Sequence, residues 1–190
     1  MRIFAISGSL RAASSNTALI QAAALLASDT ADIDIYDGLA EVPAFNPDID
    51  ERDVPAAVRA FRNRIDRADA VLISSPEYAH GVPGVLKNAL DWIVGSGELA
   101  GKPIGLVNAS SRATLAYASL TETLTVMSGR LISGAAGIVP VTKGATADDL
   151  VADPILSANL RALLGALIGV AIECRRAGTT DDESRKAGKV

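Results

Sequence analysis

Short apolar runs alternate with helical patterns along the chain, and this alternation restricts the possible folds more than any other feature of the sequence. Apolar runs typical of strands occupy residues 2–7, 33–36, 71–75, 104–108 and 137–141. Helical patterns occupy residues 16–27, 55–67, 83–94 and about 115–128, and a last long helix is predicted from Pro154 to about Arg176. Such alternation indicates an α/β fold whose parallel sheet is covered by helices on both faces.

Five parallel strands with right-handed crossovers favour the strand order 2-1-3-4-5 in a three-layer sandwich. Sheets of this kind bind ligands beyond the carboxyl ends of their strands, where the winding of the chain reverses. Three predicted loops leave those ends, at residues 8–15, 76–82 and 109–112. We therefore expect the functional residues in these loops.

The chain has 190 residues, which is enough for one domain with a full hydrophobic core. We assign residues 1–176 to this domain and expect a flexible tail over residues 177–190, which are small and charged. The irregular segment 38–54 is either a flap or subunit contact near the site, or a plain surface excursion. The apolar run 162–172 is predicted to be too short to cross a bilayer and to form a buried core helix.

Charge and cysteine content argue against several classes of protein. The formal net charge is −4 and no stretch concentrates lysine and arginine, so nucleic-acid binding has little electrostatic support. Cys174 and His80 are the only cysteine and histidine, which are too few for a structural zinc site. An unpaired cysteine and the lack of a signal-peptide pattern predict a cytoplasmic protein that has no membrane attachment.

The first loop carries the residue types of an anion-binding site. It runs from Ser7 to Thr17 as Ser-Gly-Ser-Leu-Arg-Ala-Ala-Ser-Ser-Asn-Thr and opens the first predicted helix. A helix N-terminus offers unpaired N–H groups and partial positive charge, and Arg11 adds a full charge. The loop has neither a Walker A motif nor Gly-x-Gly-x-x-Gly, so a terminal monophosphate is the favoured ligand. A plain helix cap by Ser14 or Ser15 is the simpler alternative.

The second loop, residues 76–82, is expected to turn several backbone groups towards one edge of a planar ring, with Tyr78 along that ring. Two motifs then carry a resemblance that covers about residues 1–176. They are Gly8-Ser9-Leu10-Arg11-x-x-Ser14-x-Asn16 and Pro76-Glu77-Tyr78 through Leu86-Lys87-Asn88-Ala89-x-Asp91-Trp92. In these motifs the chain resembles the NADPH-dependent FMN reductase family, which includes quinone, azo-dye and chromate reductases.

The resemblance implies a flavodoxin-like fold that binds FMN at the strand ends. The residues expected around the phosphate are Ser9, Arg11, Ser14, Ser15 and Asn16. Those expected around the isoalloxazine are Pro76, Glu77, Tyr78, the backbone of Ala79 and, at the pyrimidine edge, Ser110 and Arg112. The chain departs from the family pattern where Ala79 replaces a common Asn, Gly81 replaces a common Ser, and a glycine pair is missing after Asn108.

The resemblance also implies an enzyme that passes two electrons from NADPH or NADH through FMN to a small acceptor such as a quinone or free flavin. Hydride would enter at the flavin N5 in a ping-pong sequence, with no catalytic side chain and no metal. His80 is interpreted as a loop or interface residue. A homodimer or homotetramer is expected, because relatives complete the pocket with a neighbouring chain. The alternatives are a flavodoxin-type electron carrier and a flavin-free regulatory domain.

Overall fold

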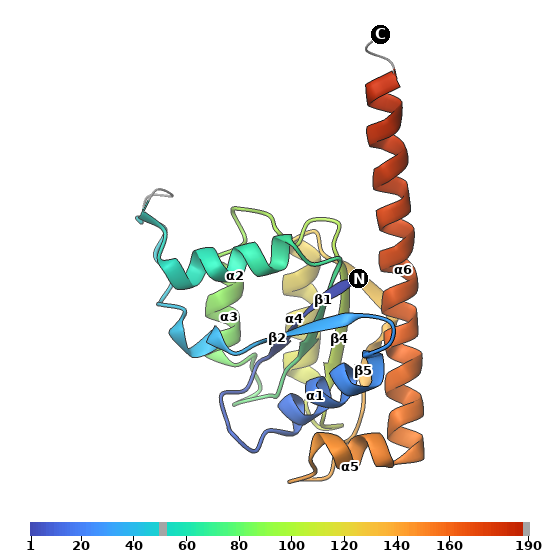
Figure 1. Ribbon diagram of the computed structural model, residues 1–190. Helices are drawn as coiled ribbons and strands as arrows, with labels where there is room; N and C mark the ends of the chain where they lie inside the picture. Colours follow the sequence, from blue (N-terminus) through green and yellow to red (C-terminus); the bar gives the residue numbers. More distant parts are fainter. Residues whose placement is uncertain (50–52, 188–190) are drawn as a thin grey trace.

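A five-stranded parallel sheet in the order β2-β1-β3-β4-β5 forms the centre of the protein (Figure 1). The computed structural model describes residues 1–49 and 53–187, with side chains up to residue 177. The strands are β1 (Arg2–Ser7), β2 (Asp32–Tyr36), β3 (Ala70–Ser74), β4 (Pro103–Asn108) and β5 (Arg130–Ile138). The predicted α/β class and strand order 2-1-3-4-5 are confirmed.

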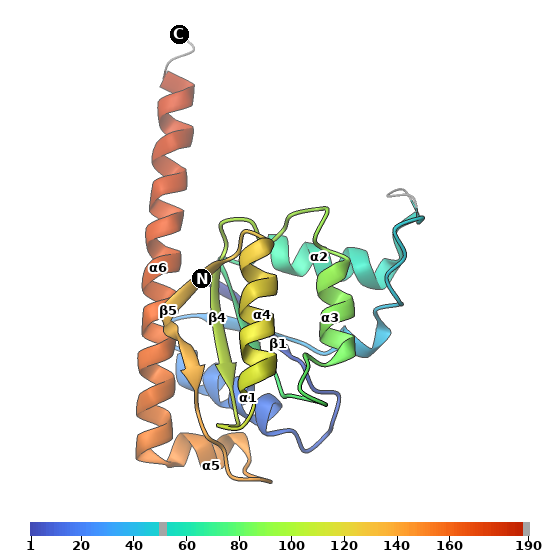
Figure 2. The same ribbon diagram turned by 180° about the vertical axis from the view of Figure 1, so that it is seen from behind.

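Helices cover both faces of this sheet, as Figures 1 and 2 show. One layer contains α1 (Ser15–Ala27), α5 (Ala147–Ala152) and α6 (Pro154–Ala187). The other contains α2 (Ala56–Asp66), α3 (Gly84–Asp91) and α4 (Thr114–Val126), and a 3-10 helix, η1 (Gly38–Glu41), follows β2. The predicted helices lie within a few residues of these bounds, except that α5 was not predicted and α6 ends about eleven residues later than predicted.

Strand β1 shows how the sequence places two cores on one sheet. Its side chains alternate between the faces, so Phe4 and Ile6 pack towards the α2–α4 layer while Ile3 and Ala5 pack towards the α1–α6 layer. All four are almost completely buried. Burial on both faces explains why the central strands consist of continuous apolar runs, as a parallel sheet requires.

Strand β5 differs most from the prediction, which placed it at residues 137–141. It runs from Arg130 to Ile138, and its pairing with β4 shifts register between Ile104 and Leu106. The strand is rich in glycine and alanine and lies half-exposed at the edge of the sheet, so it lacks the apolar run that marks the other strands. The prediction therefore placed Val141 in a strand, whereas it lies in the loop that follows β5.

The last helix is longer than predicted. Within residues Pro154–Ala177 of α6, an 18-residue window has a mean hydropathy of 1.9, so by length and composition alone this helix could cross a membrane, although the predicted apolar run 162–172 is itself shorter. A core helix meets the same criterion, and Leu160, Leu164 and Leu167 are buried in the core on the α1 face of the sheet. The backbone helix continues to Ala187. The flexible tail over 177–190 stays a prediction, and residues 188–190 lie outside the described residues.

The irregular segment after β2 packs against α3. The carbonyl oxygen of Pro43 accepts hydrogen bonds of 2.8 Å from Asn88 Nδ2 and Trp92 Nε1, and Phe45 stacks edge-on against Trp92. None of the described residues of this segment lines the cavity described below. The segment is therefore fixed to the α3 layer of the fold, and its residues 50–52 lie outside the described residues.

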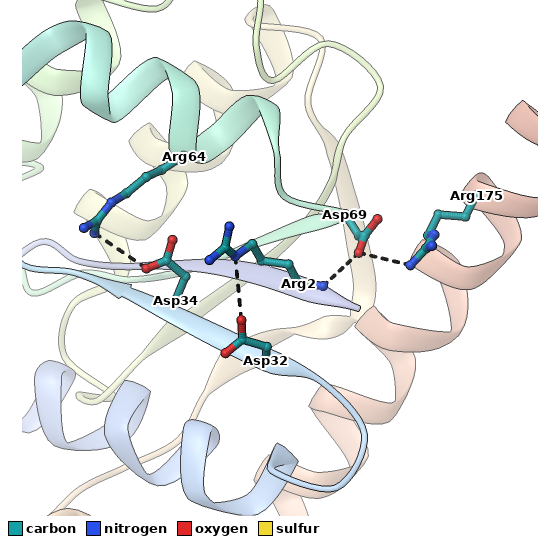
Figure 3. A network of polar contacts seen from close by, with 6 residues as sticks. All are labelled: Arg2, Asp32, Asp34, Arg64, Asp69 and Arg175. Carbon is teal, nitrogen blue, oxygen red and sulfur yellow. Dashed lines mark hydrogen bonds and ion pairs between the residues drawn. The ribbon is translucent and has the colours of Figure 1, made fainter.

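Charged side chains gather near the amino ends of the strands (Figure 3). The backbone N–H of Arg2 donates a 2.8 Å hydrogen bond to Asp69 Oδ2, and Arg175 Nη1 of α6 lies 3.5 Å from the same oxygen. Arg64 and Asp34 form another ion pair at 3.6 Å. Exposed ion pairs contribute little stability individually. They distinguish this charged end from the opposite, loop-bearing end of the sheet.

Candidate functional site

A cavity of about 420 Å³ opens at the carboxyl edge of the sheet. Loops that follow β1, β3, β4 and β5 line it, which is the arrangement predicted for ligand binding in a sheet of this order. The predicted site residues that line this cavity are Ser9, Arg11, Ser14, Ser15, Asn16, Pro76, Tyr78, Ser110 and Arg112. Glu77 and Ala79 do not line it.

The loop after β1 is held by its own hydroxyl groups and by a close approach to β3. Ser14 caps α1 and accepts a 3.4 Å hydrogen bond from the Thr17 N–H, so the predicted helix cap is present. Gly8 donates its N–H to the Ser74 carbonyl at 2.8 Å. A Cβ atom at Gly8 would lie 2.9 Å from Ser75 Oγ, so only glycine fits here without a shift of its neighbours.

This cap leaves most of the loop's backbone donors free. Within the described part of the chain, no protein acceptor pairs with the backbone N–H groups of Leu10, Ala12, Ala13, Ser14, Ser15 and Asn16. They surround the N-terminus of α1, where the helix dipole adds partial positive charge. A loop with a run of unpaired N–H groups at a helix N-terminus is an anion-binding cradle. The helix cap, posed by the sequence as the alternative to an anion site, is therefore present and leaves these N–H groups available for an anion.

Asn16 joins three of the loops. Its Oδ1 accepts a 2.9 Å hydrogen bond from Ser74 Oγ at the end of β3 and a 3.3 Å bond from the backbone N–H of Ala109 after β4. The residue is 6 % exposed. Its carbonyl oxygen is therefore a structural acceptor at the floor of the cavity, while its Nδ2 has no protein partner among the described residues.

The loop after β3 contains a tight two-residue turn. Tyr78 and Gly81 exchange two backbone hydrogen bonds, of 3.1 and 2.9 Å, and the intervening Ala79 and His80 have φ angles of 49° and 62°. Both central residues are thus in the left-handed region that a type I′ turn requires and that Asn and Gly adopt most easily. The turn projects Tyr78, which is 54 % exposed, towards the first loop, where its Oη lies 3.4 Å from Ser9 Oγ.

Glu77 points away from the main cavity. One carboxylate oxygen accepts a 2.8 Å hydrogen bond from the backbone N–H of Ala116 in α4, and the other lies 3.2 Å from His80 Nδ1. With its side chain only 12 % exposed, Glu77 links the β3 loop to the start of α4. Glu77 was expected among the residues around the ring. In the structure it lies behind the turn and lines a smaller neighbouring cavity of about 240 Å³.

The loop after β4 is shaped by Asn108, which bonds to two residues of the loop. Asn108 Nδ2 donates to the Ala113 carbonyl at 2.8 Å, and its Oδ1 accepts from the Ser110 N–H at 2.9 Å. These bonds close the loop into a compact turn. Ser110 and Arg112 line both the main cavity and its smaller neighbour.

A fourth loop, which follows β5, also lines the site and was not predicted from the sequence. Pro140, Val141 and Lys143 line the main cavity, and the Val141 N–H donates a 3.0 Å hydrogen bond to the Ala109 carbonyl. The prediction of a strand at 137–141 assigned Pro140 and Val141 to that strand, whereas Lys143 follows this range and was not singled out. A strand that ends at Ile138 would have placed these residues at the carboxyl edge.

The cavity is positively charged although the whole chain carries a net charge of −4. Among the described residues, Arg11, Arg112 and Lys143 line it, without any carboxylate, and their side chains have no protein partner. No group of three metal-ligating side chains occurs in the described part of the chain. This environment favours an anionic ligand that accepts many hydrogen bonds at one end.

Comparisons with known proteins show which proteins the chain resembles. The sequence profile of a family described as NADPH-dependent FMN reductase matches residues 1–143. An NAD(P)H-dependent FMN reductase of Pseudomonas aeruginosa is 39 % identical over 113 residues, which are 58 % of this chain and 60 % of that protein. A quinone reductase of Escherichia coli K12 is 34 % identical over 114 residues, with the same shares. The chain spans about three-fifths of the length of these relatives.

A solved structure gives broader coverage. The flavoenzyme FerB, an NAD(P)H:(acceptor) oxidoreductase from Paracoccus denitrificans, superposes with a TM-score of 0.72 and 27 % sequence identity over 87 % of this chain and 96 % of its own. The flavodoxin-like fold implied by the motifs is thereby confirmed. The profile match covers all five strands and the loops after β1 and β3, which carry the two motifs. The chain belongs to the NADPH-dependent FMN reductase family.

Proposed function

We propose that the protein is an FMN-dependent oxidoreductase that takes two electrons from NADPH or NADH and passes them to a small acceptor such as a quinone or free flavin. The observation that carries this proposal is the cavity at the carboxyl edge, where unpaired backbone N–H groups and unpaired cations meet an exposed tyrosine turn. The relatives named above have such activities, which supports the same class of reaction here.

The residues present fit FMN. The run of free N–H groups at the start of α1, together with Arg11, suits a terminal phosphate that accepts bonds from several sides. The Tyr78–Gly81 turn and the compact Asn108–Ala113 loop follow β3 and β4, whose carboxyl ends are joined by Asn16. Together these two loops suit a flat ring system. Seven backbone and side-chain oxygens and nitrogens around the floor are already paired within the protein, which keeps the cavity shape fixed before a ligand arrives.

In the proposed mechanism the protein acts by binding and orientation. FMN, when bound, supplies the redox chemistry by accepting and releasing hydride. The first loop and Arg11 would hold the phosphate end, and Tyr78 lines the cavity beside that loop. Arg112 contributes positive charge on the β4 side of the cavity, which would favour a negatively charged ring. The open mouth leaves room for the donor and the acceptor to occupy the same place in turn, as a ping-pong sequence requires.

One spectroscopic experiment tests the proposal. The purified protein is loaded with FMN, freed of excess flavin and mixed anaerobically with NADPH or NADH, and a quinone is added after the absorbance change. We expect the flavin absorbance near its visible maximum to be lost with the pyridine nucleotide alone and to return with the quinone. Inertness towards both nucleotides would favour an electron carrier. Failure to take up FMN would favour a flavin-free domain.

The assembly is a second part of the proposal. We infer that the protein works in the cytoplasm as a homodimer or homotetramer. The assembly is inferred because Tyr78, which lines the cavity, and Leu10 of the first loop are both more than half exposed. A neighbouring chain placed there would cover the exposed ring face. Sedimentation or light scattering at micromolar concentration checks this, and a monomer that reduces quinones at full rate would contradict it.

A further inference from the structure

We propose that Lys143 is a phosphate-binding residue that assists Arg11 at the phosphate end of the cavity. The proposal rests on the proposed function, namely that this cavity binds FMN. Neither the ligand motifs nor the resemblance assigns a role to Lys143, which lies in the loop between β5 and α5.

The position of the β5–α5 loop carries the argument. After Lys143, residues Gly144 to Ala147 line a cavity of about 280 Å³ together with Ala13, Ser14 and Thr17. The loop thus runs alongside the part of the first loop where α1 begins. It is fixed at both ends, because Val141 bonds to the Ala109 carbonyl and Thr146 forms a capping box with Asp149 at the start of α5. Lys143 therefore lines the main cavity from an anchored segment that continues alongside the start of α1.

The other described lysines have protein partners, and Lys143 does not. Lys87 Nζ pairs with Asp91 at 2.6 Å, and Lys102 Nζ donates to three carbonyl oxygens at the end of α2. Of the lysines whose side chains the structure describes, Lys143 is the one without an ion pair or hydrogen bond. A cation on an anchored loop that faces a cavity without carboxylates is available for an anionic ligand.

Arg112 occupies a different end. It lines the smaller cavity together with Pro76, Glu77 and Ala113, which belong to the ring side of the site, whereas Lys143 does not. Arg112 and Lys143, which are not part of the phosphate motif, therefore lie in different parts of the site. Arg112 is near the ring turn and Lys143 is near the start of α1.

Charge balance gives the physical reason for a second cation. A phosphomonoester carries about −1.5 to −2 charges at pH 7. Arg11 contributes one positive charge and a helix N-terminus about half a charge, so up to about half a negative charge is left uncompensated. The ammonium group of Lys143 compensates this deficit.

The test compares FMN with riboflavin, which has the same ring and no phosphate. Dissociation constants of both flavins are measured by fluorescence quenching for the wild type and for Lys143→Met, Lys143→Arg and Lys87→Met. We expect Lys143→Met to weaken FMN binding about tenfold and to leave riboflavin binding unchanged, since a charge-assisted bond of modest strength is lost. Lys143→Arg keeps the charge and should bind FMN within about threefold of the wild type. Lys87→Met makes the same change in net charge away from the cavity and should bind like the wild type.

Salt dependence gives a second readout. The FMN dissociation constant of the wild type should rise with ionic strength more steeply than that of Lys143→Met, because one screened charge pair is missing in the variant. An unchanged FMN affinity in Lys143→Met, or an equal loss for FMN and riboflavin, would overturn the assignment of Lys143 while leaving the FMN site intact. A wild-type protein that binds neither flavin would overturn the proposed function itself.

Discussion

The carboxylate of Glu77 accepts a hydrogen bond of 2.8 Å from the backbone N–H of Ala116, which joins the loop after β3 to the first turn of α4. The residue at the N-cap of α4, Ala113, has no side chain that can perform this task. Glu77, which precedes Ala116 by 39 positions, therefore caps the helix in its place. The bond holds together the two loops that flank the ring end of the cavity.

Replacement of Glu77 should reduce stability according to whether the acceptor survives. We expect Glu77→Ala to lower the free energy of unfolding of the apoprotein by about 1–2 kcal/mol, because a helix-capping bond is lost. Glu77→Gln keeps an acceptor oxygen for the Ala116 N–H and should lose less than half as much. Urea denaturation followed by circular dichroism measures both. Equal losses in the two variants would show that the charge, and not the hydrogen bond, stabilises the loop.

The Tyr78–Gly81 turn should be improvable. Ala79 and His80 have positive φ angles, whereas Asn-Gly is the favoured pair for a type I′ turn. The double variant Ala79→Asn, His80→Gly should therefore raise the free energy of unfolding by about 1 kcal/mol. Ala60→Gly on the exposed side of α2 is a matched control, which should lower it by about 0.5–1 kcal/mol. If the turn variant is instead destabilised, the contact of His80 with Glu77 stabilises the fold by more than the positive φ angles of the turn destabilise it.

Asn16 and Ser74 should be energetically coupled. Asn16→Ala leaves the completely buried Ser74 hydroxyl and the Ala109 N–H without an acceptor, so the free energy of unfolding should fall by about 1–3 kcal/mol. Ser74→Ala removes one of the two donors that Asn16→Ala leaves without an acceptor. The double variant should then be more stable than the sum of the single changes predicts. Strict additivity in this double-mutant cycle would contradict the proposed hydrogen bond.

Lys102 should lose its proton at lower pH than an ordinary lysine. Burial lowers its pKa below 10.5, and the nearby carboxylates of Asp66, Asp69 and Glu98 only partly oppose this. Between the folded-state and unfolded-state pKa values the unfolded chain binds more protons, so the contribution of Lys102 to stability rises with pH in that alkaline window. NMR titration of the lysine side-chain carbons gives the midpoint. A midpoint at or above 10.5 would disagree, and Lys102→Met should abolish the signal and the stability rise.

The fold followed from the sequence wherever burial and backbone chemistry act locally. The strands around Ile6 and Ile73 are buried on both faces, so their sequences must be continuously apolar and were found at nearly the right bounds. Pro154 begins α6 as its position predicted. Much of the site followed as well, because a loop that leaves a strand and enters a helix must present N–H groups there.

The parts that escaped prediction depend on contacts between distant residues. The direction of the Glu77 carboxylate is set by Ala116, and the structural use of the Asn16 amide is set by Ser74 and Ala109. No local pattern encodes either partner. Strand β5 was predicted at the wrong residues because its small residues pair at the edge of the sheet without an apolar signal, and Pro140 and Val141 were assigned to it as a result.

The course of α6 has a practical consequence for coupling the protein to an electrode or a bead. The helix starts beside α5, at the end of the molecule that carries the cavity, and runs about 50 Å towards the opposite end (Figures 1 and 2). A linker attached behind Ala187 would therefore leave the molecule far from the ligand loops. Immobilisation through that point should present the cavity to the solution, whereas attachment near Thr142 should obstruct it.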